Sequence, residues 1–152
     1  LFPTYSWGGA AGLSAVWAEE HTRESIFAAF RRKETYATSG NRIKLRFFGG
    51  FDFGQFDLSS NNLIKEAYKR GVPMGGSLVS DEVQSPEFLI WAQKDPKTTS
   101  RQRRQVIKGW IEPSDGSTHE KVCGAACSDG LKVNPRTNRC PNNGARVNVS
   151  NC

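Results

Sequence analysis

Hydrophobic positions recur at helical spacing in one stretch of the chain more clearly than elsewhere. From Thr22 onward the apolar stripe consists of Ile26, Phe27, Ala29 and Phe30. Thr22 can accept a hydrogen bond from the first turn, and the charges of Arg31 to Lys33 suit the negative end of a helix. We therefore predict a helix from about Arg23 to Lys33.

Two further elements follow from local patterns. The run IKLRFFGGFDF alternates well enough for a strand that ends at Gly49 and Gly50. The run SSNNLIKEAYKRGVPMGG predicts a short helix with Asn61 or Asn62 as its cap and Gly71 as its stop. Residues 1–14 lack periodicity and are predicted to be irregular, and TYATSGNR is predicted to be a loop.

Later in the chain, short β-branched or aromatic runs are separated by turn signals such as SDGS and PNNG. These runs are PEFLIWAQKD, RQVIKGWIEP, HEKVCGAACS and ARVNVSN. Strands at this spacing favour a sandwich-like sheet domain. We therefore predict an α+β chain, with a terminal helical segment over residues 1–40 and a mostly β domain over 41–152. Since one helix cannot bury its own apolar face, it must pack on the β domain or on a larger body.

Length and charge narrow the functional classes. The 152 residues carry a net charge of +6, with 10 Lys/Arg against 7 Asp/Glu up to Gly76 and 11 against 8 afterwards. Neither part is a basic arm, and we interpret RQRR, Arg101 to Arg104, as a solvated loop rather than a nucleic-acid site. No apolar run approaches the roughly 20 residues that a membrane span needs.

All four cysteines fall near the C-terminus, at positions 123, 127, 140 and 152. Their spacing lacks the C-x2-C knuckles of zinc ribbons, and no histidine lies among them, so four-thiolate zinc is a poor match. Disulfides in an exported, periplasmic or extracellular protein suit the pattern better. Three pairings are possible; the turn-rich segment between Cys127 and Cys140 favours a local bridge, although spacing alone does not decide it.

Candidate chemistry gathers at the start of the first predicted helix. Glu19, Glu20, His21 and Arg23 crowd a helix N-terminus, where an anion, a metal ligand or a general base could be placed. Alternatively, the carboxylates only complement the helix dipole and Arg23 pairs with one of them. His119, the second of two histidines, lies far along the chain in a predicted turn, so a metal site of several imidazoles is hard to assemble.

Five runs of the sequence together resemble those of a known protein family. They are GLSAVWAEEHTRESIFAAFRRKETYATSGNRIKLRFFGG, AYKRGVPMGGSL, FLIWAQKDP, QVIKGW and HEKV. They closely resemble a bacterial family catalogued as domain of unknown function 3604, over nearly the whole chain. His21 stands where the family usually has Asn. The resemblance implies longer, commonly exported proteins whose N-terminal part is similar to the metal-dependent barrel of the polymerase and histidinol phosphatase superfamily.

That superfamily binds its metals through H-x-H and Asp-x-His motifs, which this sequence lacks. The resemblance therefore implies a C-terminal segment: the last barrel helix followed by a β domain, without cofactor of its own, inactive alone, and partnered by the rest of a barrel that holds divalent metals. Glu20 and Arg23 are our candidates for orienting a substrate, a small phosphoester or a carbohydrate, or for orienting the groups around the metal ligands at the mouth of the barrel.

A competing hypothesis is a noncatalytic β-sandwich module that binds a carbohydrate or a partner protein. Exposed rings would favour it, because an aromatic platform stacks on sugars, although core packing is the expected fate of most of them. The rings in question are Phe51, Phe53, Phe56, Trp91 and Trp110.

Overall fold

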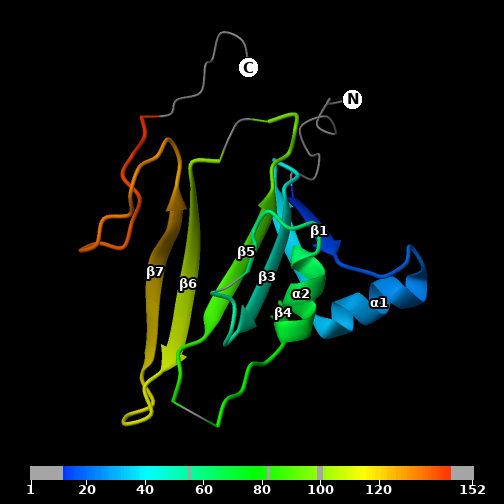
Figure 1. The fold of residues 1–152 in the computed structure, drawn as a ribbon, viewed down its shortest axis with the longest axis horizontal. Coiled ribbons are helices and arrows are strands. Elements are labelled where there is room, and N and C mark those ends of the chain that lie inside the picture. The colour runs from blue at the N-terminus through cyan, green and yellow to red at the C-terminus, as the bar shows by residue number, and fades with distance from the viewer. Residues whose placement is uncertain (1–11, 55, 82, 99–100, 145–152) are drawn as a thin grey trace, which may run out of the picture. The chain divides into compact units, whose positions relative to one another are not determined.

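The computed structural model describes residues 12–54, 56–81, 83–98 and 101–144. The chain divides into two compact units, Leu1–Thr98 and Thr99–Cys152, which we call the first and the second unit. Figure 1 labels most of their elements, and within the described residues two short helices accompany mostly strands, which confirms the α+β class. The domain boundary predicted at residue 40 concerns a longer protein and stays a prediction.

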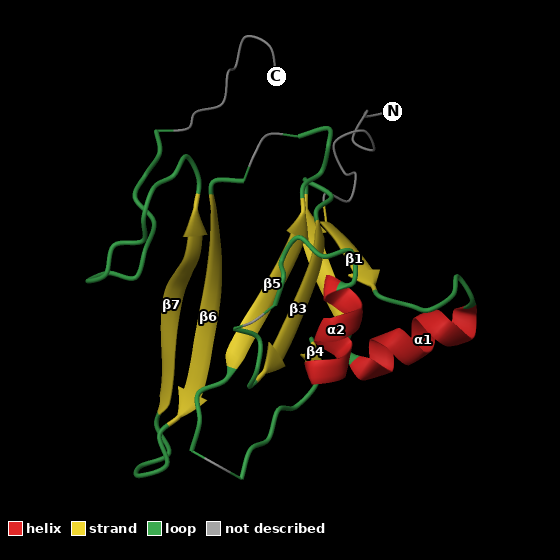
Figure 2. Cartoon of the chain, in the orientation of Figure 1, coloured by secondary structure: helices red, strands yellow, loops and turns green. Residues whose placement is uncertain are grey.

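The strands form three small antiparallel sheets, with orders β1-β2, β4-β3-β5 and β6-β7 (Figure 2). Sheets of two or three strands do not make the two broad facing layers of a sandwich. A sandwich is therefore not evident among the described residues. No helix in the same residues is long and apolar enough to cross a membrane.

The first sheet departs from the sequence prediction. β1 (Gly12–Val16) pairs with β2 (Thr35–Ser39) in a register that sets Ala15 opposite Tyr36. The predicted irregular lead-in and the predicted TYATSGNR loop were wrong at these positions. β2 is rich in β-branched and aromatic residues, which suit strands, but its alternation is too short to be recognised without its partner.

The helix α1 (Arg23–Arg32) confirms the strongest local prediction. The Thr22 hydroxyl accepts from the Ser25 N–H at 3.2 Å, and the Ser25 hydroxyl accepts from the Glu20 N–H at 3.1 Å. The first bond satisfies an amide that the first turn leaves free, and the second ties the segment before the cap to the same turn. Lys33 ends the helix in the left-handed region, with φ of 60°.

The second sheet and the helix α2 (Leu63–Arg70) form the main core of the first unit. β3 (Lys44–Gly50) lies between β4 (Gly71–Pro73) and β5 (Glu87–Gln93), as predicted for the strand before the paired glycines. Phe53 packs so closely over Gly50 and Gly71 that a Cβ at either glycine would collide with its ring. The buried cluster consists of Phe48, Phe53, Leu63, Ala67 and Leu89.

The second unit is built on a long hairpin. β6 (Arg103–Ile111) pairs with β7 (Thr118–Cys127), and a register shift lies between Arg104 and Gln105. The strand predicted from RQVIKGWIEP is confirmed and begins one residue earlier, at Arg103, so the loop predicted for RQRR holds only for Arg101 and Gln102. Arg103 and Arg104 pair with Cys127 and Ala126.

The predicted Cys127–Cys140 disulfide is confirmed, with a Cα–Cα distance of 5.5 Å. It ties the segment that follows β7 back to the hairpin, and the Gly124 N–H donates to the Asn138 carbonyl. Cys123 has no disulfide to a described residue. Cys152 and the predicted strand ARVNVSN lie outside the described residues.

Candidate functional site

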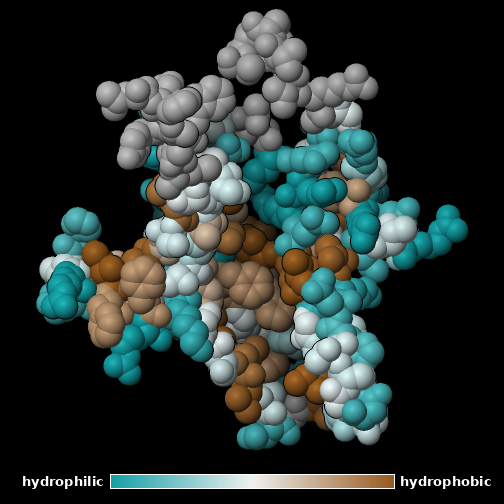
Figure 3. All heavy atoms as spheres, turned by 180° about the vertical axis from the view of Figure 1, so that it is seen from behind, coloured by the Kyte–Doolittle hydropathy of each residue, from teal (hydrophilic) through white to brown (hydrophobic). Residues whose placement is uncertain are grey.

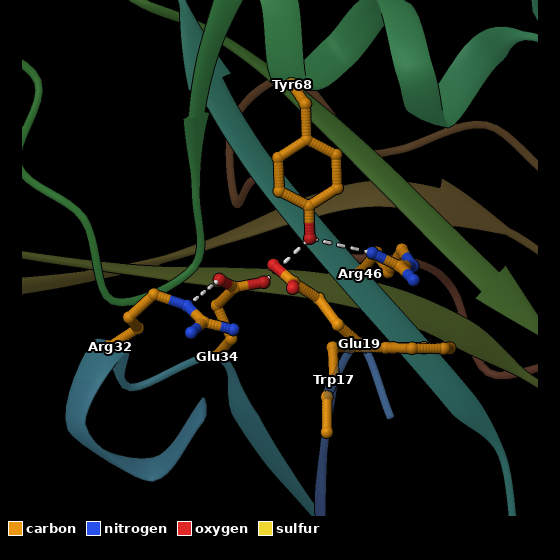
Figure 4. A pocket seen from close by; sticks show the side chains of 7 residues that line it. Trp17, Glu19, Arg32, Glu34, Arg46 and Tyr68 are labelled. Carbon is orange, nitrogen blue, oxygen red and sulfur yellow. Dashed lines mark hydrogen bonds and ion pairs between the residues drawn. The ribbon is translucent and has the colours of Figure 1, made fainter. Parts of the chain in front are cut away.

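A polar pocket lies in the first unit where the end of β1, the end of α1, β3 and α2 meet. Its volume is ≈ 370 Å³. Figure 4 shows side chains from these elements converging on it. The lining residues are Trp17, Ala18, Glu19, Arg32, Glu34, Arg46 and Tyr68.

Glu34 is the buried carboxylate of this pocket, with 5% of the residue exposed. Its Oε1 accepts from Arg32 Nε at 2.8 Å, and its Oε2 accepts from the Tyr68 hydroxyl at 2.7 Å. A carboxylate removed from water is tolerated when both oxygens have such partners. The two contacts therefore hold Glu34 in one orientation.

Tyr68 connects this carboxylate to a second arginine. Its hydroxyl donates to Glu34 and accepts from Arg46 Nη1 at 2.9 Å (Figure 4). Burial and the hydrogen bond to Glu34 raise the pKa of Tyr68, and Arg46 partly opposes them. The phenol therefore stays protonated at neutral pH and remains available as a donor.

Arg46 is held across the face of Trp17, with the guanidinium carbon 3.6 Å from the ring centroid. Trp17 is fixed in turn, because its Nε1 donates to the Leu45 carbonyl at 2.8 Å. A stacked guanidinium keeps its in-plane donors directed outward from the ring edge. Among the described residues Arg46 forms no ion pair with a carboxylate, so its charge is available to a ligand.

Glu19 supplies the other unneutralised charge in the pocket. Its side chain is directed toward the Tyr68 hydroxyl in Figure 4, and the residue is exposed. It forms no ion pair within the described part of the chain. Arg32 is already matched by Glu34, whose hydrogen bond raises the pKa of Arg32. Among the described residues, Arg46 and Glu19 thus line the pocket without an ion pair of their own, although Glu19 also contributes to the raised pKa of Arg32.

The predicted site residues Glu20 and Arg23 lie outside this pocket. Both are exposed, and neither forms an ion pair with a described residue. Arg23 lies along a separate, mostly apolar hollow of ≈ 740 Å³ on α1. That hollow is lined by His21, Thr22, Arg23, Glu24, Ile26, Phe27 and Phe30. A role for Glu20 and Arg23 in orienting substrate stays a prediction.

In the first unit, the rings proposed for an aromatic platform are buried or half-buried. Phe53 is buried in the core, Phe56 and Trp91 pack against that core, and Phe51 is half-buried. Trp110 belongs to the second unit, where it is 37% exposed. His119 is exposed at the start of β7.

A metal centre would need several ligating side chains close together in the described part of the chain. Within the described ranges, His, Cys, Asp and Glu nowhere gather in a group of three or more that could hold an ion. Divalent metals prefer several such ligands at once. We therefore derive no step through a metal from this chain.

Comparison with known families decides where the chain belongs. The family described as protein of unknown function (DUF3604) matches residues 3–152. The chain belongs to this family. A search of curated proteins found no match to the DUF3604 chain, and a search of solved structures found none either.

The residues that sequence reasoning missed lie inside the motifs of this DUF3604 chain. Glu34 is in RRKETYATSG, where only the preceding basic residues were given a role, and Tyr68 is in SSNNLIKEAYKRGVPMGG, where only the cap and the stop of the helix were named. One signal was present: Glu34 follows the end of α1, where a negative charge is unfavourable to the helix dipole. Because the helix dipole does not favour Glu34 at this position, the carboxylate points to a role outside the helix.

Proposed function

We propose that this DUF3604 chain is the C-terminal segment of an exported, metal-dependent hydrolase-like protein and that its polar pocket orients a small phosphoester. The observation that carries the proposal is Arg46, a guanidinium without a carboxylate partner among the described residues, stacked on Trp17 beside the Glu34–Tyr68 pair. The metals expected in the longer protein would belong to its barrel and supply Lewis-acid activation of water.

Each pocket residue has a definite part in this proposal. Arg46 binds a phosphoryl oxygen, because a planar guanidinium matches phosphate geometry. Tyr68 keeps Arg46 in place, and Glu34 keeps Tyr68 in place through the hydrogen bonds described above. Glu19 accepts a hydrogen bond from a hydroxyl group of the substrate. The chain's own contribution is therefore to bind and orient.

The apolar surface of α1 supports the idea of a larger body. Phe27 is 62% exposed and Phe30 is 50% exposed, whereas Ala29 on the same helix is fully buried. Brown and tan side chains lie along α1 at the left of Figure 3. Full burial of a Phe side chain stabilises by roughly 1.5–3 kcal/mol. We propose that the preceding part of the barrel covers these rings.

Binding of phenyl phosphate, followed by ³¹P NMR titration, tests the pocket. We expect weak binding, with a Kd on the order of 1 mM, because one free arginine contributes most of the attraction. Arg46→Gln should abolish saturable binding, and Arg46→Lys should weaken it because the planar fork is lost. The matched control is Arg42→Gln, which removes the same charge outside the pocket.

Glu19→Gln is a second test that leaves the core untouched. Since the exposed carboxylate repels a phosphate nearby, its removal should tighten binding. Equal binding by the wild type, Arg46→Gln and Arg42→Gln would show that the pocket does not hold phosphoesters. Stoichiometric, tightly bound metal in the purified chain would overturn the assignment of the metal ligands to another part of the protein.

A further inference from the structure

One face of the β6–β7 hairpin carries an unusual pair of like charges. Lys108 on β6 lies directly opposite Lys121 on β7 in the antiparallel register. The next pair on the same face is Trp110 with His119, whose rings stack with centroids 5.2 Å apart. The Lys108 ammonium lies 5.2 Å from the Trp110 ring centroid, which places it on this face as well.

These two lysines have no neutralising partner in the described part of the chain. Both are exposed, and no ion pair joins either of them to a carboxylate there. Glu120, next to Lys121 along β7, projects to the opposite face because neighbouring strand residues alternate. Like charges directly opposite each other destabilise a strand pair. The hairpin therefore bears a cost that an anion on this face would remove.

Arg104 extends the cationic row along β6. It lies four residues before Lys108, so alternation places both on one face, roughly 13 Å apart along the strand. Arg104 is also exposed. Three cations thus follow the ribbon, with the Trp110–His119 stack at one end. We call Arg104, Lys108, Lys121, Trp110 and His119 the basic face.

The division into units shows where the protein's charge lies. The second unit contains nine Lys/Arg against four Asp/Glu, a net charge of +5. The first unit contains 12 against 11, a net charge of +1. The difference in net charge is hidden when the chain is divided at Gly76, because acidic residues between positions 77 and 98 lower the net charge of the part after Gly76. The second unit is therefore a basic module attached to a nearly neutral one.

We propose that the basic face binds an acidic polysaccharide, a polymer of carboxylated or sulfated sugars. A row of exposed cations along an extended ribbon suits a linear polyanion rather than a compact one. The Cys127–Cys140 disulfide in the same unit is typical of oxidising compartments outside the cytosol, away from the nucleic acids of the cell interior. Lys108, fixed over Trp110, presents a charge whose position is already ordered.

The test uses the full chain and immobilised probes: heparin as a sulfated polymer, polygalacturonate as a carboxylated one, dextran as a neutral one and oligothymidylate as a nucleic acid. At about 50 mM salt, where screening is weak, heparin or polygalacturonate should bind and dextran should not. Lys108→Gln combined with Lys121→Gln should weaken binding by about tenfold, since two exposed ionic contacts are lost. The matched control combines Lys132→Gln with Arg136→Gln, both exposed and outside the hairpin strands.

Thermal melting provides a readout that does not depend on binding strength. Lys108→Gln should raise the Tm of the free protein because the like-charge pair is gone. Heparin should raise the Tm of the wild type more than that of the double variant. Equal loss of binding in the double variant and the control, or binding no tighter than to dextran, would overturn the proposal. Tighter binding to oligothymidylate than to either polysaccharide would overturn the ligand class.

Discussion

Replacing Tyr68 by Phe removes one hydroxyl and thereby tests the pocket's hydrogen-bond network. That hydroxyl donates to Glu34, which is 5% exposed, and accepts from Arg46. Hydrogen bonds to charged groups contribute about 1.5–3 kcal/mol, and a buried acceptor without its donor is penalised. Tyr68 is 42% exposed, so water can partly replace the hydroxyl. We therefore expect a loss in the free energy of unfolding near the lower end, about 1.5 kcal/mol.

Urea unfolding followed by tryptophan fluorescence measures this loss. A change of about 1.5 kcal/mol corresponds to a fall in Tm of roughly 6–12 °C for a unit of this size. The matched control is Tyr36→Phe, because the Tyr36 hydroxyl has no hydrogen bond to a described residue. Its effect should stay within about 0.5 kcal/mol.

The same variant makes a prediction about pH. The folded protein raises the pKa of Tyr68 above its ordinary value of 10.0, so folding favours the protonated phenol. The associated stability is fully present below that ordinary value and is lost as pH rises through the higher folded pKa. The wild type should therefore lose stability in this alkaline window more steeply than Tyr68→Phe. Equal stability of Tyr68→Phe and Tyr36→Phe, with equal alkaline slopes, would refute the network.

Three other substitutions test the fold. Thr22→Ala removes the hydroxyl that accepts from Ser25, so thermal melting by circular dichroism should show a loss of about 1 kcal/mol. Phe48→Ala empties a site where the ring is 1% exposed, and urea unfolding should show a loss of about 3–5 kcal/mol; a loss below 1 kcal/mol would contradict its place in the core. Cys127→Ser with Cys140→Ser opens the disulfide loop, and the second unit should lose about 3 kcal/mol, as should the wild type in reductant.

The pocket also changes the interpretation of the sequence motif that begins at Gly12. Its visible cluster of Glu19, Glu20, His21 and Arg23 drew attention, yet only Glu19 lines the polar pocket. Trp17 has the larger structural role, because it fixes Arg46 and also packs edge-on against Trp91 at 6.5 Å. Closeness in sequence to the charged cluster therefore predicted the pocket residues less well than the contacts that other helices and strands make with Trp17.

Local signals determined the two helices. The Thr22 cap, the apolar stripe and the basic last turn lie within one short segment, and α1 begins and ends close to the predicted residues. The end of α2 at Gly71 was also predicted from neighbouring residues alone. Capping and helical periodicity act over a few residues, so the sequence alone contains the information. The turn-rich loop favoured a Cys127–Cys140 bridge, but the sequence left three pairings open and the structure decided among them.

The sheets and the polar pocket required the tertiary structure. β2 is recognised only through its pairing with β1, and the sandwich expected from strand spacing gave way to three small sheets. The pocket joins Trp17, Glu34, Arg46 and Tyr68 from separate segments, and Tyr68 bonds to a carboxylate 34 positions away. Such contacts depend on strand pairing and on burial between distant segments. Sequence periodicity describes the faces of an element, whereas only the folded chain decides which faces meet.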